Sequence, residues 1–218
     1  MISEKMKKPI WMTAVSVLLV ALAACSKESP HRPPEDNAKG RITFTSRGDK
    51  ITCSPDYNLA IFEKTQGSNY ERTDFYRLDI QGEKKYGESE SYGVVLQMIT
   101  TGPLEKGIYP IVDAEDLGSY YYGATNPADP VDVALGIVSD SGSPDRAKDV
   151  RSTGGGQLEV SDITLGAYHS GEVEGEAGYR KGFISGTFSF PGTNWEKTAT
   201  GTCTGKFEHV PIKIYDSE

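Results

Sequence analysis

Histidine and carboxylate side chains are the residues of this sequence that could hold a metal ion. His169 and His209 are the only histidines after residue 40, and acidic residues gather at 113–116 and 172–176. Zinc sites space their ligands in recognisable patterns, and calcium loops follow an Asp-x-Asp-x-Asp-Gly pattern. The sequence contains neither pattern. We therefore expect no metal site and no cofactor, and we interpret both acidic runs as solvated loops.

Patterns that would indicate catalysis are weak. Ser141 does not lie in the Gly-x-Ser-x-Gly turn of the esterases. The acidic residues are many, but nothing marks two of them as the close carboxylate pair of a glycoside hydrolase. Gly154–Gly156 precede a strand-like segment, whereas a phosphate-binding loop precedes a helix. We predict no catalytic residue, and a hydrolase is the least favoured function.

Aromatic residues in turn-rich segments are better candidates for recognition. Tyr120, Tyr121 and Tyr122 lie between two glycines, and Trp195 lies in a second loop. Exposed rings on such loops can stack on sugars or anchor a protein partner. The alternative is that these rings cover the open end of the fold. We take the four residues as a possible ligand or partner surface.

The charge of the chain excludes one class of partner. The chain of 218 residues carries a formal net charge of −8, and residues 1–24 carry +2, so the remainder carries about −10. Nucleic-acid phosphates require clustered Lys and Arg. An acidic domain is also not attracted to anionic lipid by its overall charge. We therefore expect no nucleic-acid partner.

The N-terminal residues have the form of an export signal. Basic residues 5–8 precede the apolar run Ile10–Ala24, which is too short for a transmembrane helix of about 20 residues. The run ends in Leu-Ala-Ala-Cys at Cys25, which resembles the bacterial lipobox. The resemblance implies that residues 1–24 are a cleaved signal peptide and that Cys25 carries acyl chains such as palmitate. The alternatives are an ordinary signal peptide with a chance cysteine and an uncleaved anchor.

The segment after this cysteine reads as a tether. Residues 25–39 are rich in proline and charge and have no large apolar side chain, so we expect them to be disordered. Two acyl chains give stable anchoring where one does not. Ser26 favours sorting to the outer membrane. We expect a protein of the bacterial cell envelope, anchored to the membrane but not spanning it.

Cys53 and Cys203 remain once Cys25 is assigned. Both lie on the apolar parity of strand-like segments, and an exported compartment permits disulfides. A bridge between them would close a long loop and stabilise the fold by about 4 to 5 kcal/mol in the chain-entropy model. Two buried free thiols are the equally supported alternative.

Alternating apolar and polar residues predict strands throughout residues 40–218. No stretch has a helical period, and Gly and Pro separate the segments. At Ser161–Asp162 the apolar parity reverses, which predicts a β-bulge. We predict one all-β domain, an antiparallel β-sandwich or flattened barrel of roughly 8–11 short strands. The expected strands are 41–46, 51–53, 59–64, 75–81, 91–101, 107–112, 131–139, 156–165, 182–190 and 200–212.

Three segments carry a resemblance to a known group of proteins. They are ITFTSRGDKITCS near the start, VVLQMITTGPLEKGIYPI in the middle, and the closing set GGGQLEVSDI, GFISGTFSF and TGTCTGKF. Together they resemble small, uncharacterised β-sandwich lipoproteins of Bacteroidetes-type bacteria, which have a G-x-I-S-G-T-F-x-F strand. The resemblance implies a β-sandwich in the cell envelope and brings no catalytic residue. The acidic, Gly-rich segment 166–180 departs from the pattern, and we expect a loop there.

These observations favour a cell-envelope lipoprotein with a binding or structural role. Its partners would be the membrane, through Cys25, and an envelope protein or a glycan. A glycan-binding module that uses the loop aromatics is the alternative.

Overall fold

A computed structural model describes residues 40–65, 75–87, 90–116, 132–140, 149–170 and 177–216. All of them belong to one compact unit, Asn37–Glu218. Three predicted features lie outside the described residues: the signal peptide and tether at 1–39, the acylated Cys25, and Tyr120–Tyr122.

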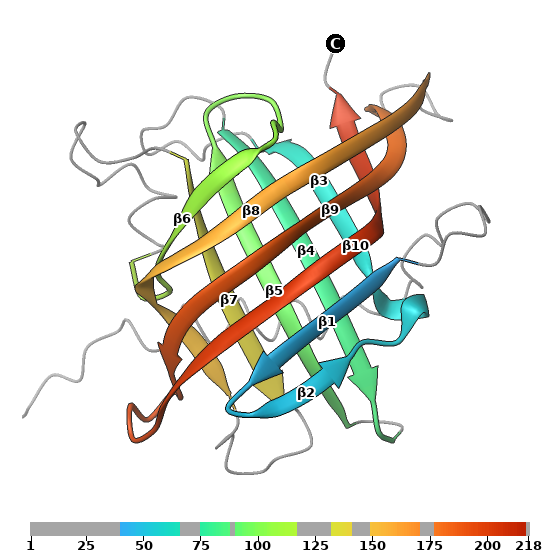
Figure 1. The fold of residues 1–218 in the computed structure, drawn as a ribbon. Coiled ribbons are helices and arrows are strands. Elements are labelled where there is room, and N and C mark those ends of the chain that lie inside the picture. Colours follow the sequence, from blue (N-terminus) through green and yellow to red (C-terminus); the bar gives the residue numbers. More distant parts are fainter. Residues whose placement is uncertain are drawn as a thin grey trace, which may run out of the picture. The chain divides into compact units, whose positions relative to one another are not determined.

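Ten strands and one short 3₁₀ helix make up the regular structure of the described residues, so the predicted all-β class is confirmed (Figure 1). The elements are β1 (Arg41–Ser46), β2 (Asp49–Thr52), η1 (Pro55–Tyr57), β3 (Leu59–Thr65), β4 (Phe75–Lys85), β5 (Ser91–Thr100), β6 (Gly107–Asp113), β7 (Val133–Asp140), β8 (Val150–His169), β9 (Gly178–Thr193) and β10 (Thr200–Asp216).

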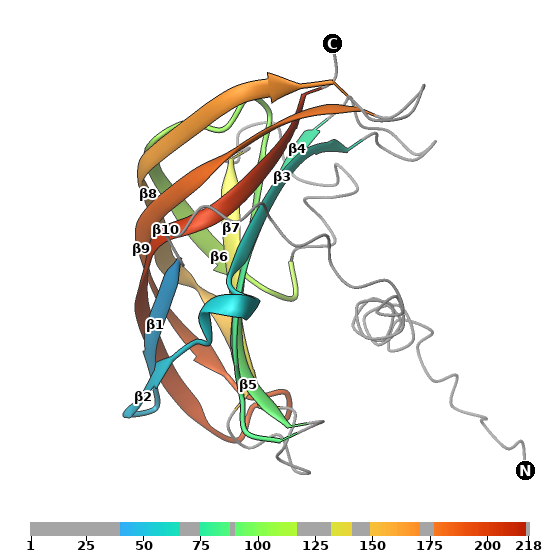
Figure 2. The ribbon, with the colours of Figure 1, turned by 90° about the vertical axis from the view of Figure 1, so that its right-hand side faces the viewer.

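The strands form one sheet that folds back on itself. Its order is β2-β1-β10-β3-β4-β5-β7-β6-β8-β9, and the additional pairings of β9 with β10 and of β7 with β8 close it. Figures 1 and 2 show the result as two layers, with β1, β2, β8, β9 and the first half of β10 (the front layer) crossing over β3, β4, β5 and β7 (the back layer). Most neighbouring strands pair antiparallel, whereas β3 runs parallel to β10 and β6 runs parallel to β7.

Strand β10 passes from one layer to the other. Its first half, up to Glu208, pairs with β1, whereas Ile212–Tyr215 pair with β3. The register shifts between Phe207 and Val210, and His209 has a positive φ of 48°. A β-bulge bends a strand and increases its twist. The bulge at Glu208–His209 therefore forms the corner at which the sheet folds.

The N-terminal end of the domain is fixed at this corner. Gly40 lies so close to His209 and Pro211 that a Cβ atom on it would stand 2.6 Å from the Cα atom of Val210. The buried side chain of Asn58 donates a hydrogen bond of 2.8 Å to the Gly40 carbonyl. The segment that precedes residue 40 therefore joins the domain beside the second half of β10.

Phenylalanines and glycines complement each other in the core. In the register of β9 and β10, Gly186 lies opposite Phe207 and Phe188 lies opposite Gly205. A Cβ atom on either glycine would overlap the facing aromatic ring. Both phenylalanines are buried, at 0–2% exposure. Glycine in a strand commonly marks such a close approach. The strand predicted over residues 182–190 is confirmed, since it lies within β9.

Strands β8 and β9 contain a β-bulge and extend further than the sequence pattern predicts. The predicted bulge is confirmed, because Ser161 is an extra residue between the pairs Val160–Gly186 and Asp162–Ser185. The prediction of a loop over residues 166–180 was wrong at both ends of that range, since β8 continues to His169 and β9 begins at Gly178. These ends are polar and Gly-rich and carry no apolar alternation, so the sequence pattern missed them.

Candidate functional site

Cys53 and Cys203, the two cysteines of the domain, are both buried free thiols in the structure. Cys203 lies in β10 opposite Phe190 of β9 and Ser46 of β1, whereas Cys53 follows β2 and lies against Gly82 of β4. Burial raises the pKa of each thiol to about 12, and the charge of Glu83 adds to the effect at Cys53. Such thiols are inert structural groups and not nucleophiles.

Trp195, the described member of the predicted surface, lies in the turn between β9 and β10. Asn194 is buried and fixes this turn, since its side-chain oxygen accepts hydrogen bonds from the N–H groups of Thr198 and Ala199 at 2.9 and 3.0 Å. Lys197 adopts a positive φ of 56°, which completes the tight turn. Trp195 is half-buried, and these hydrogen bonds define the turn that presents its ring.

Charged side chains from two other elements surround this ring. The guanidinium of Arg151, in β8, lies 4.6 Å from the Trp195 ring centroid. It also contacts the carboxylate of Glu115 at 2.7 Å, and Lys197 contacts the same carboxylate at 3.0 Å. The hydrogen bond from Lys197 and the charge of Arg151 lower the pKa of Glu115, so this carboxylate is ionised at neutral pH. We call Trp195, Arg151, Glu115 and Lys197 the tryptophan cluster.

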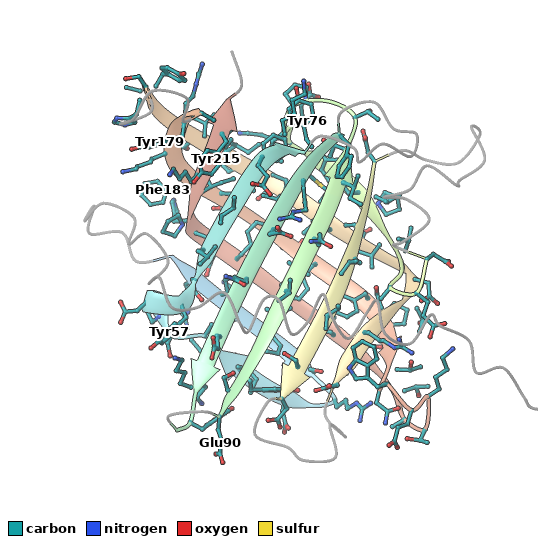
Figure 3. All side chains as sticks on the ribbon, turned by 180° about the vertical axis from the view of Figure 1, so that it is seen from behind. Tyr57, Tyr76, Glu90, Tyr179, Phe183 and Tyr215 are labelled. Carbon is teal, nitrogen blue, oxygen red and sulfur yellow. The ribbon has the colours of Figure 1, made fainter. Side chains whose placement is uncertain are left out.

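A second group of aromatic and charged side chains lies where β9 begins and β10 ends. Tyr179 lies opposite Tyr215 in the register (Figure 3). Lys181 lies opposite Lys213 on the same two strands. The ammonium of Lys213 stands 4.0 Å from the Tyr179 ring centroid and 4.5 Å from that of Tyr215. We call these four residues the tyrosine–lysine face.

The two histidines considered for metal binding border the tyrosine–lysine face. His169 stacks on Tyr179 with ring centroids 5.3 Å apart, and His209 packs against Phe183 at 6.4 Å. Within the described ranges, no group of three or more His, Cys, Asp or Glu side chains could hold a metal ion. No pattern in the sequence indicates this face, because its rings and ammonium groups come from strands that pair only in the fold.

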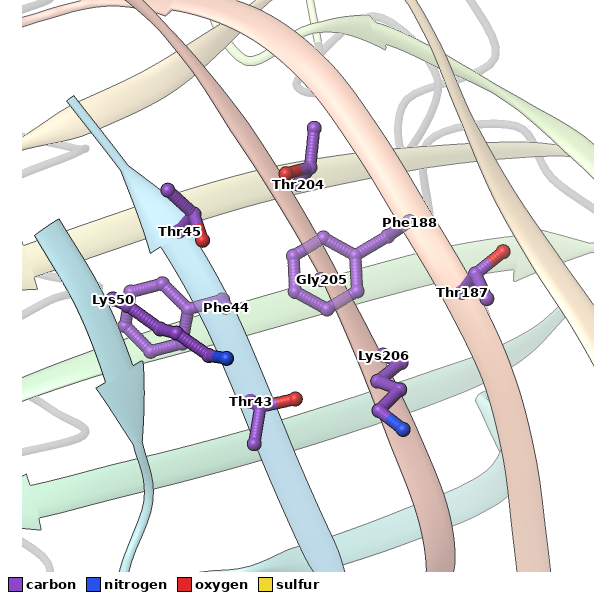
Figure 4. Close-up of a pocket in the computed structure, with 9 residues that line it drawn as sticks. All are labelled: Thr43, Phe44, Thr45, Lys50, Thr187, Phe188, Thr204, Gly205 and Lys206. Carbon is purple, nitrogen blue, oxygen red and sulfur yellow. The ribbon is translucent and has the colours of Figure 1, made fainter. Parts of the chain in front are cut away.

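The outer face of the front layer has a shallow depression over Gly205 (Figure 4). Threonine side chains from β1, β9 and β10 surround it, and Lys50 and Lys206 stand beside it. Lys206 is paired with Glu208 at 2.8 Å, and the Thr187 hydroxyl donates to Glu159 at 3.1 Å. Because internal partners engage both Lys206 and Thr187, we assign no ligand to the depression.

One polar network lies on the outer face of the back layer. Arg77, in β4, stands 2.9 Å from the Glu63 carboxylate and 2.8 Å from that of Asp79, and Gln97 donates to Asp79 at 2.6 Å. Burial raises the pKa of Asp79, although Arg77 and Gln97 act in the opposite direction. Carboxylates with raised pKa values occur in catalytic sites, but structural ion-pair networks raise them too.

Comparisons with protein-family models, with curated proteins and with solved structures find no significant match to this chain. Among the described residues, no helix has the length and apolar character needed to cross a bilayer.

Proposed function

We propose that this chain is a lipid-anchored protein of the bacterial cell envelope whose β domain presents a binding surface around Trp195. The sequence around Cys25 supports the anchor, since a basic segment, a short apolar run and small residues precede the cysteine. The filled core of the domain supports a scaffold role, because phenylalanine rings occupy the space over its glycines.

The arrangement of the tryptophan cluster is the observation that carries the binding role. The Arg151 guanidinium lies over the Trp195 ring, and Glu115 holds both Arg151 and Lys197. Tryptophan and arginine are enriched in binding hot spots. Because the Trp195 ring is already oriented, a partner that docks on it loses little side-chain entropy. An envelope protein is the partner we favour, and the alternative is a glycan that stacks on the Trp195 ring.

Replacement of Trp195 tests this role. A photo-crosslinking residue at exposed Glu196 should capture a partner in intact cells, and Trp195→Ala should reduce that capture about tenfold or more, as for a hot-spot residue. Tyr86→Ala is the matched control, since Tyr86 is an exposed aromatic residue after β4. Capture that is equal in the two variants would contradict the proposal. A glycan array probed with the same variants distinguishes a sugar from a protein.

A further inference from the structure

The tyrosine–lysine face combines features that internal stability alone does not explain. Lys181 and Lys213 lie directly opposite each other on neighbouring strands, and like charges in that position are destabilising. Neither ammonium forms an ion pair in the part of the chain that the structure describes. Glu63, opposite Tyr215 on β3, is engaged by Arg77. The face therefore presents two positive charges with no internal counter-charge among the described residues.

The aromatic rings of this face are poor platforms for a sugar. The Tyr179 ring is contacted by the Lys213 ammonium at 4.0 Å and stacks with His169. A pyranose that stacked there would have to displace these groups. Tyrosine and lysine together, each with an apolar body and a polar end, are instead typical of the level of lipid headgroups. Large exposed apolar side chains occur at the same end of the domain, Leu165 at 39% exposure and Tyr168 at 41%.

Charge favours a zwitterionic surface over an anionic polymer. The chain after residue 24 carries a formal net charge of about −10. The acidic domain as a whole repels polyanions. A zwitterionic headgroup such as phosphatidylethanolamine offers a phosphate to the lysines but has no net negative charge that would repel the acidic domain.

The attachment point of the anchor lies near this face. Gly40 contacts the backbone at His209–Pro211, and β10 continues from there to Lys213 and Tyr215. The segment between Cys25 and Gly40 spans at most about 50 Å when fully extended. An anchor on Cys25 would therefore keep this end of the domain within reach of the bilayer.

We propose that the tyrosine–lysine face docks on the zwitterionic headgroups of the membrane that holds the Cys25 anchor. This inference rests on the lipid anchor of the proposed function. Docking would place the tryptophan cluster away from the lipid, because that cluster lies at the other end of the paired strands β9 and β10.

Fluorescence quenching in vesicles tests the docking. The acylated full-length product is reconstituted in phosphatidylethanolamine–phosphatidylcholine vesicles that contain lipid brominated near the headgroup, in a Trp195→Phe background. A Tyr215→Trp probe should be quenched roughly twofold more than a Tyr86→Trp probe, which reports the exposed end of β4. Adding Lys181→Gln and Lys213→Gln should reduce the quenching of the Tyr215→Trp probe but leave flotation with the vesicles unchanged.

The possible failures can be told apart. Equal quenching of the two probes on floating vesicles would overturn the docking and leave the anchor intact. A response of the Tyr215→Trp probe to a soluble uronate polysaccharide, with no lipid quenching, would also overturn it and assign the face to a glycan. A chain that does not float at all would refute the anchor, on which both proposals depend.

Discussion

Single residues explain why β9 and β10 pair so closely. Gly186 and Gly205 each lie opposite a phenylalanine of the neighbouring strand, and each ring occupies the volume that a Cβ atom would need. The GTFSF and GKF segments are therefore two halves of one packing arrangement. These residues are required for the complementary shapes of glycine and phenylalanine and not for any reactive group.

Gly186→Ala should destabilise the domain by about 1–3 kcal/mol, because the added methyl group overlaps the buried Phe207 ring and the backbone of β8. The measurement is the midpoint of urea unfolding. Gly102→Ala is the matched control, since a Cβ atom there meets nothing within 4 Å, and it should change stability by less than about 0.5 kcal/mol. Equal effects of the two changes would refute this account of the core.

The buried thiols lead to a second prediction at this scale. Cys53 and Cys203 should react with iodoacetamide at least about 100-fold more slowly in the folded protein than in denaturant, because burial raises each pKa to about 12 and blocks access. Mass spectrometry without reductant should show both residues alkylated after unfolding. Alkylation that requires prior reduction would instead demonstrate the disulfide.

Among the elements, β10 and its bulge organise the molecule. The bulge at Glu208–His209 divides β10 between a partner in one layer and a partner in the other, and Gly40 is held beside it. Sequence alternation predicts all ten strands and the Ser161 bulge, because most of the strands bury mainly one parity. It does not predict the parallel pairing of β3 with β10, since pairing partners far apart in the sequence leave no local signal.

The candidate sites, like the strands, are only partly predictable from the sequence. Trp195 is recognisable from the sequence as a large aromatic residue in a loop that Pro191 and Gly192 precede. Arg151 and Glu115, which contact it or support it, come from other elements, and only the fold brings them together. The tyrosine–lysine face is missed altogether, because its residues belong to strand ends that resemble a loop in sequence.

The network on the outer face of the back layer leads to a pH-dependence. Asp79 has a raised pKa in the folded state, so between the ordinary value of 3.8 and the raised value the folded state holds more protons than the unfolded state. Stability contributed by protonated Asp79 is therefore present at low pH and lost as the pH rises through the folded pKa. Urea unfolding at about pH 4 and about pH 7 should show this loss in the native protein and not in Asp79→Asn.

Asp162→Asn is the control for that measurement. A hydrogen bond from Lys106 lowers the pKa of the exposed Asp162, so the folded state favours its ionised form. Asp162 therefore contributes a small stability that increases as the pH rises, and its replacement should leave the fall caused by Asp79 in place. If Asp79→Asn kept the same fall in stability between the two pH values as the native protein, burial of Asp79 would not be its cause.

At the scale of the whole molecule, the two aromatic groups lie at opposite ends of one long pair of strands. Tyr179 pairs with Tyr215 near one end, and Thr193 pairs with Thr200 near the other, about 45 Å away along β9. Gly40 joins the domain on the side of the tyrosines. A domain held at that end would present Trp195 outwards, which is the geometry that a membrane-anchored binding protein requires.

The most direct test of the account is the intact mass and N-terminal sequence of the protein from the membrane fraction. We predict that the mature chain begins at Cys25 with acyl chains attached, and that Cys25→Ser abolishes both the lipid mass and the cleavage at this bond. A mature chain that begins elsewhere, or that carries an unmodified Cys25, would contradict the lipid anchor.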